Sequence, residues 1–278
     1  AAPVFAECDP VLENWTRAGD PIYRDIMPGQ NYQAASDGHV FTGPDGVLRM
    51  FYSGDDSDFS AIKLAKGTDL ATWEFDRTLI GVSAGHVSPI EKETAFYYLA
   101  PNGEHQIYFI GYADNTTYEA SVYLATASDI DGPYSVLPEP VVSRGPLAGR
   151  DVFLITSPSV VTHDGLLHMA FLGWNGFEDV TAVWTMGATS DDNGRTWQNM
   201  AQVDVPIGME GQLTVAPDGT FVATRTGEVS NTEGIVIACA DHPFGPYTAF
   251  EEPALVKAGA PFETDEIIAP QITFDPAT

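Results

Sequence analysis

One short pattern occurs four times along the 278-residue chain, and it constrains the fold more than any other feature. Each copy is a turn dipeptide, Asp-Gly or Asn-Gly, followed by an apolar run that ends in glycine. A β-rich run also precedes each turn, and this combination predicts a β-hairpin. The four runs are LRMFYSG (48–54), QIYFIG (106–111), LHMAFLG (167–173) and FVATRTG (221–227).

Each predicted hairpin is followed by a third β-rich run and a polar turn that ends in an aromatic residue. These segments cover residues 63–75, 123–136, 186–199 and 236–250. The resulting order is strand, tight turn, strand, loop, strand, aromatic turn, strand. This is the order of a four-stranded propeller blade, so the sequence predicts four such blades.

A fifth unit is split between the two ends of the sequence. Residues 4–22 match the third and fourth strands of a blade, with Trp15 in the aromatic position, and residues 268–276 match a first strand. We therefore expect one all-β domain over residues 1–278. It would be a five-bladed β-propeller of four-stranded antiparallel blades, closed by joining N- and C-terminal strands in one blade (1–24 and 262–278). One strand of that blade is missing from the sequence, and a cleaved tail, an absent segment or a second chain would each supply it.

Charge excludes several classes of partner. The chain has 12 basic and 39 acidic side chains, which gives 12 − 39 = −27. Nucleic acids and anionic membranes are attracted by clustered Lys and Arg, which this sequence lacks. No apolar run approaches the roughly 18 residues of a membrane span. We expect a monomer with a solvated acidic surface.

Two features bear on the compartment. The sequence opens Ala1-Ala2-Pro3 without an initiator Met, as in a mature protein after signal cleavage or in a trimmed sequence. The two cysteines, Cys8 and Cys239, form either a single disulfide or two buried thiols, and both interpretations stay open. The expected location is secreted or periplasmic.

The first strand of each propeller blade lines the central tunnel, and aligning these strands gives a column of candidate site residues. Three of the five members are carboxylates, which would converge at the mouth of the tunnel. Converging carboxylates repel one another, so at least one pKa rises and one group stays protonated near neutral pH. Glycosidic bond cleavage needs this combination of a carboxylic acid and a carboxylate. The column is Asp37, Glu93, Ser157, Glu210 and Ala269.

The blade pattern, with Asp37-Gly38-His39 and Met209-Glu210-Gly211-Gln212, resembles the five-bladed propeller glycosidases of glycoside hydrolase family 43 (β-xylosidases and α-L-arabinofuranosidases) and their fructan-cleaving relatives. The resemblance implies hydrolysis of a plant or algal saccharide, with Asp37 as general base and Glu210 as general acid. Two positions depart from the family pattern. Ser157 stands where a third carboxylate is expected, so that role is empty or has moved to Glu93 or Asp151. Gln212 stands where the family has proline.

Several residues near the column are candidates for substrate binding. Trp174 would stack on a sugar ring or pack between blades, and Arg225 would pair with a column carboxylate or with substrate oxygens. His39 would orient water or a central ion, or would be a hydrogen-bonded core histidine. Tyr52 and Glu266 complete the set.

No cofactor is expected to be required. His163 and His168 lack zinc-ligand spacing, whereas a structural calcium in the tunnel would suit carboxylate and carbonyl oxygens. Residues 190–197 (SDDNGRTW) fit a sialidase Asp-box, which is a structural turn in the periphery of a propeller. The alternative function is a non-catalytic propeller that binds glycans.

Overall fold

The structure, a computed structural model, describes Cys8, Leu12, Trp15 and residues 35–56, 59–81, 91–112, 118–176, 182–208, 211–229, 232–256 and 270–274. Within these residues the regular structure is almost entirely β-strand, and no helix is long and apolar enough to cross a membrane. The strands are β1 (Ala35–Thr42), β2 (Leu48–Asp56), β3 (Phe59–Asp69), β4 (Thr72–Ile80), β5 (Glu91–Leu99), β6 (His105–Tyr112), β7 (Ala120–Ala127), β8 (Ser135–Val136), β9 (Gly145–Leu147), β10 (Arg150–Val152), β11 (Leu154–His163), β12 (Leu166–Trp174), β13 (Val183–Ser190), β14 (Gln198–Gln202), β15 (Leu213–Val215), β16 (Phe221–Val229), β17 (Thr232–Ala240), β18 (Thr248–Ala249) and β19 (Leu255–Val256).

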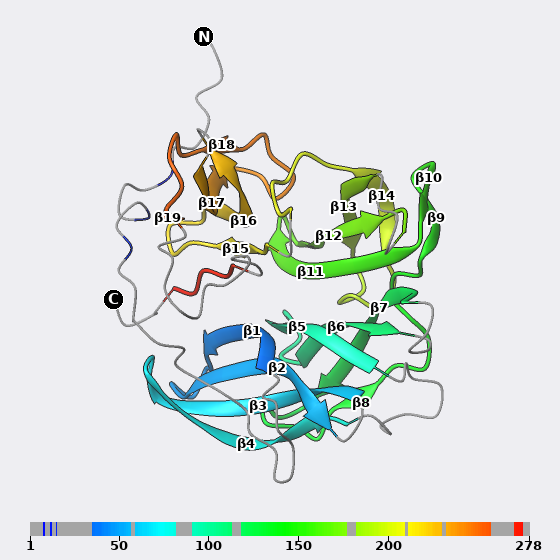
Figure 1. Ribbon diagram of the computed structural model, residues 1–278. Coiled ribbons are helices and arrows are strands. Elements are labelled where there is room, and N and C mark those ends of the chain that lie inside the picture. Colours follow the sequence, from blue (N-terminus) through cyan, green and yellow to red (C-terminus); the bar gives the residue numbers. More distant parts are fainter. Residues whose placement is uncertain are drawn as a thin grey trace.

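Four antiparallel units follow the predicted strand order. They are β1–β4, β5–β8, β11–β14 and β15–β18, which we call blades one to four. Figure 1 shows the first strand of each unit toward the middle of the molecule and the fourth strand at the periphery. Blades two and three are continuous through one parallel pair, Leu154 with Ala120. The all-β fold and the four-stranded order are thus confirmed, while the five-bladed closed ring stays a prediction.

The predicted hairpin turns form as the sequence indicates. Gly46, Gly103, Gly165 and Gly219 have φ between 78° and 92°, a left-handed conformation that glycine adopts without steric cost. The residue before the glycine also stabilises the turn. The Asp218 carboxylate, for example, accepts a hydrogen bond from the Thr220 N–H at 2.9 Å.

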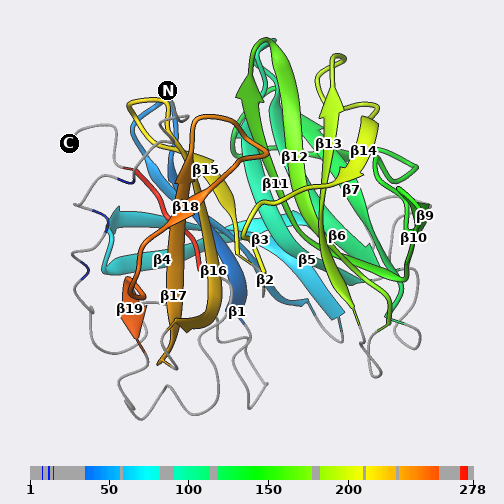
Figure 2. The same ribbon diagram turned by 90° about the horizontal axis from the view of Figure 1, so that it is seen from above.

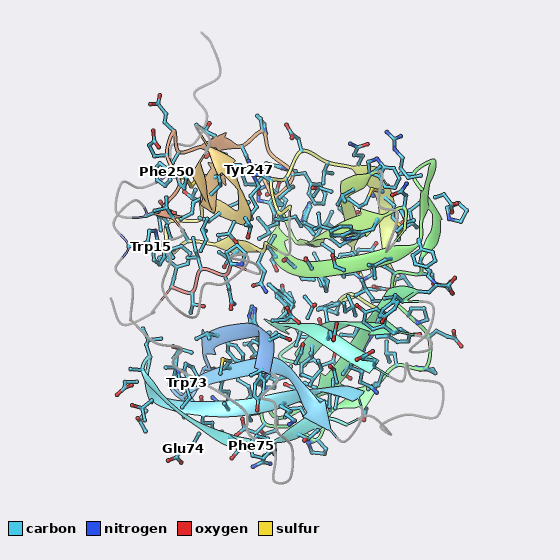
Figure 3. The ribbon with its side chains drawn as sticks, in the orientation of Figure 1. Trp15, Trp73, Glu74, Phe75, Tyr247 and Phe250 are labelled. Atoms are coloured by element: carbon cyan, nitrogen blue, oxygen red, sulfur yellow. A yellow bond between two sulfur atoms is a disulfide. The ribbon has the colours of Figure 1, made fainter. Side chains whose placement is uncertain are left out.

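The aromatic turns that contain tryptophan share one hydrogen bond. Trp73 Nε1 donates to Leu70 O at 3.0 Å, and Trp197 Nε1 donates to Gly194 O at 3.1 Å. Trp15 Nε1 donates to Leu12 O in the same three-residue pattern, which agrees with its predicted aromatic position. Figure 3 shows Trp15, Trp73 and Tyr247 away from the centre of the molecule.

Buried apolar side chains fill the seams between neighbouring blades. Phe51 of blade one packs in one cluster with Phe109 of blade two. Val122 of blade two packs with Phe171 of blade three, and Leu172 packs with Ala223 of blade four. Figure 2 shows β11–β14 of blade three running side by side as one sheet. Apolar residues of this sheet pack in the clusters shared with blade two and with blade four. This packing fixes the first strands around the middle of the molecule.

Residues from both ends of the chain lie against blade four. Cys8 forms a disulfide with Cys239 of β17, which settles the open alternative between a bond and free thiols. Cys8 and Ile272 share an apolar cluster with Val222 and Ile237. Residues 270–274 also reach blade one, because Val40 N–H donates to Gln271 Oε1 at 2.8 Å.

Candidate active site

A β-bulge occurs at the same place in three first strands. Pairing with the second strand shifts between Ser36 and His39, between Glu93 and Phe96, and between Thr156 and Ser159. The residues at the bulge, Asp37, Thr94 and Ser157, have φ of 51°, 52° and 54°. Positive φ is uncommon for such side chains, and bulges of this kind redirect side chains next to functional sites.

The bulge corrects the predicted column by one residue in blade two. Thr94, not Glu93, occupies the position equivalent to Asp37 and Ser157. Glu93 stands at the level of Ser36 and Thr156, immediately before the bulge. The alignment placed Glu93 in the column because it is a carboxylate, whereas the sequence of Thr94 does not show that this residue adopts the positive φ of the bulge.

Asp37 is held by hydroxyl groups of its own blade. Ser36 Oγ donates to Asp37 Oδ2 at 3.1 Å and Ser53 Oγ donates to the same oxygen at 3.2 Å. Ser53 also accepts a hydrogen bond from the Thr94 N–H at 3.0 Å, so it links Asp37 to the bulge of blade two. Burial raises the pKa of Asp37, and the two hydroxyl donors partly oppose this rise.

Glu93 faces blade one despite belonging to blade two. Its carboxylate accepts hydrogen bonds from Ser60 Oγ and Tyr112 Oη, each at 3.3 Å. Burial, followed by the charges of Asp37 and Glu91, raises the pKa of Glu93 to about 7. Asp37 and Glu93 therefore form an interacting carboxylate pair in which Glu93 is partly protonated near neutral pH.

His39 is buried on β1, two residues after Asp37, and contacts polar side chains. Gln271 Nε2 is 2.7 Å from His39 Nδ1, and Gln212 Oε1 is 3.3 Å from the same atom. The imidazole also packs on Phe96 with ring centroids 4.5 Å apart. Burial lowers the pKa of His39 to about 4, so the ring is neutral. The structure thus supports the core-histidine alternative, because His39 is buried and hydrogen-bonded.

The third blade contributes hydroxyl groups to the centre instead of a carboxylate. Ser157 and Ser159 are fully buried, and neither hydroxyl has a hydrogen-bond partner among the described residues. Ser157 is the positional equivalent of Asp37, as the alignment predicted. Asp151, the other candidate for a third carboxylate, is exposed on β10, which lies at the outer edge of the molecule (Figure 1).

The predicted sugar contacts differ in their placement. Trp174 ends β12, is partly buried and donates from Nε1 to Thr156 Oγ1 at 2.9 Å. Tyr52 is 1% exposed and packs with Met50 and Trp73, which corrects its assignment to substrate binding because a core ring cannot stack on a sugar. Arg225 is partly buried on β16.

Two predicted site residues, Glu210 and Glu266, lie outside the residues that the structure describes. Three contributors were not among the predicted site residues: Ser53, Ser60 and Tyr112. A usable signal existed for Tyr112 alone. It follows the repeated Gly111 as Trp174 follows Gly173, and both side chains donate to residues before a bulge.

Among the described residues no three His, Cys, Asp or Glu side chains are grouped so that they could hold a metal ion. The donors around His39 are neutral amides, which are weak substitutes for the carboxylates that calcium prefers. The described residues alone therefore form no calcium site, and a structural calcium stays a prediction.

Comparison with known proteins shows what this fold is similar to. No protein-family model and no curated protein matches the sequence. A family 43 β-xylosidase/α-arabinofuranosidase from a compost microbial metagenome, determined with xylotriose in a calcium-free form, matches with TM-score 0.58 and 14% identity over 78% of this chain and 76% of that chain. A thermostable family 43 glycoside hydrolase matches with TM-score 0.61 and 14% identity over 84% and 77%. A family 43 enzyme from Xanthomonas citri complexed with xylotriose matches with TM-score 0.57 and 18% identity over 78% and 72%. At these identities, the comparison shows that the chain has the fold of family 43 propeller enzymes.

Proposed function

We propose that this protein is a glycoside hydrolase that cleaves an oligo- or polysaccharide of plant or algal origin. The observation that carries the proposal is the interacting pair of partly buried carboxylates, Asp37 and Glu93, at the bulged ends of two first strands. The fold shared with family 43 enzymes supports it. Paired carboxyl groups with separated pKa values are the requirement for glycoside hydrolysis.

Three carboxyl groups have separate roles in the proposed reaction. Glu210, in its protonated form, donates its proton to the glycosidic oxygen as the bond from that oxygen to the anomeric carbon breaks. Asp37, as carboxylate, either removes a proton from the attacking water or attacks the anomeric carbon itself. Glu93 sets the charge at Asp37 through its own protonation state. A carboxyl separation of roughly 5 Å would favour retention, and one of roughly 6.5–9.5 Å would favour inversion.

The test is release of reducing sugar from a panel of plant and algal polysaccharides. Glu210→Gln and Asp37→Asn are each expected to abolish release while the circular dichroism spectrum stays unchanged. Glu139→Gln, which removes an exposed carboxyl group before β9, is the matched control and should remain active. Full activity in Asp37→Asn would reject the proposal.

A second candidate, a non-catalytic glycan-binding propeller, is favoured by Ser157. The buried hydroxyl of Ser157 occupies the position equivalent to Asp37, where the resemblance calls for a carboxylate. Affinity gel electrophoresis distinguishes the two candidates. Retarded migration in a polysaccharide gel without release of reducing sugar from the same polysaccharide would establish binding alone.

We also propose a secreted or periplasmic location for a monomeric protein with a carbohydrate substrate. The Cys8–Cys239 disulfide supports an oxidising compartment, because such bonds persist there and are rare in the cytosol. The net charge of −27 supports a soluble monomer. Fractionation of the native host and light scattering of the purified protein test these two statements.

A further inference from the structure

Arg225 differs from the other arginines whose side chains the structure describes. Five of the six have a polar or ionic partner, whereas Arg225 has no hydrogen bond or ion pair with any described residue. The partnered ones are Arg49 with Asp45 and Asp131, Arg77 with Asp76, Arg144 with Glu119, Arg150 with Gln202, and Arg195 with Glu104.

One glycine makes the room that the Arg225 guanidinium occupies. A Cβ atom added to Gly227 would come within 2.0 Å of Arg225 Nη1, so the guanidinium lies directly over this glycine. A Cβ on Gly208 would lie 4.0 Å from Arg225 Cδ, which is ordinary van der Waals contact, whereas Gly211 packs against the backbone of Thr224 and Arg225. The side chain therefore follows a path along β16 over Gly227, and a larger residue at position 227 would obstruct this path.

This path leads to the same end of the molecule as the carboxylate pair. Gly227 is the fourth member of the repeated glycine set, and its equivalent Gly54 pairs with Ala35, two residues before Asp37. Blades one and four meet at the middle through the His39–Gln212 contact. Trp174 packs against the seam of blades three and four at this end.

We propose that Arg225 binds an anionic group of the saccharide, either the carboxylate of a uronic acid or a sulfate ester. The inference rests on the proposed glycosidase function and adds the class of substrate. A guanidinium is always charged and presents planar paired donors that match carboxylate and sulfate oxygens. The sequence supplies 39 carboxylates, yet no described one pairs with this cation.

The negative charge of the whole protein does not oppose such a ligand at close range. Exposed charges separated by more than about 8 Å are largely screened at physiological ionic strength. A bound anion therefore responds chiefly to nearby groups. Arg225 supplies a cation at this end of the molecule, and Glu93 is partly neutral near pH 7 because its pKa is about 7.

Isothermal titration with matched pairs of sugars tests the inference. The probes are glucuronate against glucose, galacturonate against galactose, and the 6-sulfates of glucose and galactose. We expect at least one anionic probe to bind about tenfold tighter than its neutral partner, as a charge-assisted hydrogen bond provides. Arg225→Gln should remove the preference and Arg225→Lys should keep part of it. Arg150→Gln, an equal charge change at an exposed site on β10, should leave it intact.

The results separate the inference from the function beneath it. A uronate preference identifies the carboxylate as the ligand, and a preference for the 6-sulfates identifies the sulfate. Equal affinity for charged and neutral sugars, or a preference unchanged in Arg225→Gln, overturns the inference. Hydrolysis of neutral polysaccharides without any preference for anionic sugars would support the proposed glycosidase function and reject anion binding at Arg225. Anion binding at Arg225 without hydrolysis of any polysaccharide would reject the glycosidase instead.

Discussion

Burial and then the negative charge of Asp37, on the neighbouring blade, raise the pKa of Glu93 to about 7. The two carboxyl groups are joined through the protein as well, because Ser53 donates to Asp37 and accepts from the backbone of Thr94, next to Glu93. Protonation of one carboxyl group therefore changes the pKa of the other. This coupling is the property on which the proposed chemistry depends.

Removing the charge of Asp37 should lower the pKa of Glu93. In Asp37→Asn the carboxylate that disfavours ionisation of Glu93 is gone, while the burial that also raises this pKa remains. We expect the pKa to fall below 7 yet stay above its ordinary value of 4.5. Carbon-13 NMR of labelled glutamate carboxyls, with the resonance identified in Glu93→Gln, measures the change. An unchanged pKa would show that the two groups do not interact.

The same residue predicts a pH dependence of stability. The pKa of Glu93 is 4.5 when unfolded and about 7 when folded, so the folded state binds the extra proton between these values. Its contribution is fully present below pH 4.5 and is lost as the pH rises through 7. Allowing for partial exposure, the loss is about 1–3 kcal/mol. Urea denaturation at pH 4.5 and 7.5 should show a smaller loss of stability in Glu93→Gln than in the wild type, and an equal loss would contradict the assignment.

Much of the fold could be predicted because its signals are local. The turn glycine Gly46, the aromatic Trp73 and the glycine Gly54 each reflect a backbone or packing requirement that recurs in every blade. Such requirements repeat with the blade, so strand order followed from sequence. The ends of the chain gave weaker signals, and there the closed ring remains a prediction.

The candidate site could be predicted only in part, since it depends on register between strands. Asp37 was found because aspartate tolerates the positive φ of a bulge and stands out as a carboxylate. Thr94 gives no such signal, whereas the carboxylate of the adjacent Glu93 does, so the predicted column was one residue out of register in β5. Ser53 was missed because a small buried serine in a strand resembles any core position.

Arg49 should contribute far more to stability than Arg77. Arg49 is 2% exposed and joins Asp45 of blade one to Asp131 beyond β7, at 2.7 Å in each case. Arg49→Met leaves Asp131 without this partner in a partly buried site, and we expect a loss of about 2–4 kcal/mol. Arg77 is 53% exposed and pairs with Asp76, so Arg77→Met is the matched control, with an expected change below about 1 kcal/mol. Urea denaturation compares the two, and equal losses would contradict the prediction.

The Cys8–Cys239 disulfide should stabilise the attachment of the N-terminal segment to blade four. It joins residues 231 positions apart. A cross-link that closes such a large loop lowers the conformational entropy of the unfolded chain. Replacement of both cysteines by serine should lower stability by about 2–5 kcal/mol. Thermal unfolding of the double variant measures this, with dithiothreitol-treated wild type as a second comparison. Equal melting temperatures with and without the bond would show that the segment is held by packing alone.

Three of the six histidines form a cluster between blades three and four, on the turn side of β11. The ring centroids of these residues, His163, His168 and His242, are 5.0–5.8 Å apart. The Asp164 carboxylate is 3.4 Å from His163 Nε2, and its charge favours the protonated form of His168 and His242. Burial and then the neighbouring imidazoles lower the pKa of His168 below 6.5, and burial followed by His163 does the same for His242.

Because these pKa values are lower in the folded state, the unfolded chain binds more protons as the pH falls. The contribution of the cluster is present above pH 6.5 and is lost as the pH drops through the folded values. His168→Phe keeps an aromatic ring in the seam and removes the buried titrating group. Its melting temperature should therefore fall less than that of the wild type between pH 7.5 and 5, by about 2–4 °C for each kcal/mol retained. If the melting temperatures of the two proteins fall equally between pH 7.5 and 5, the pKa values of the cluster do not differ between the folded and unfolded states.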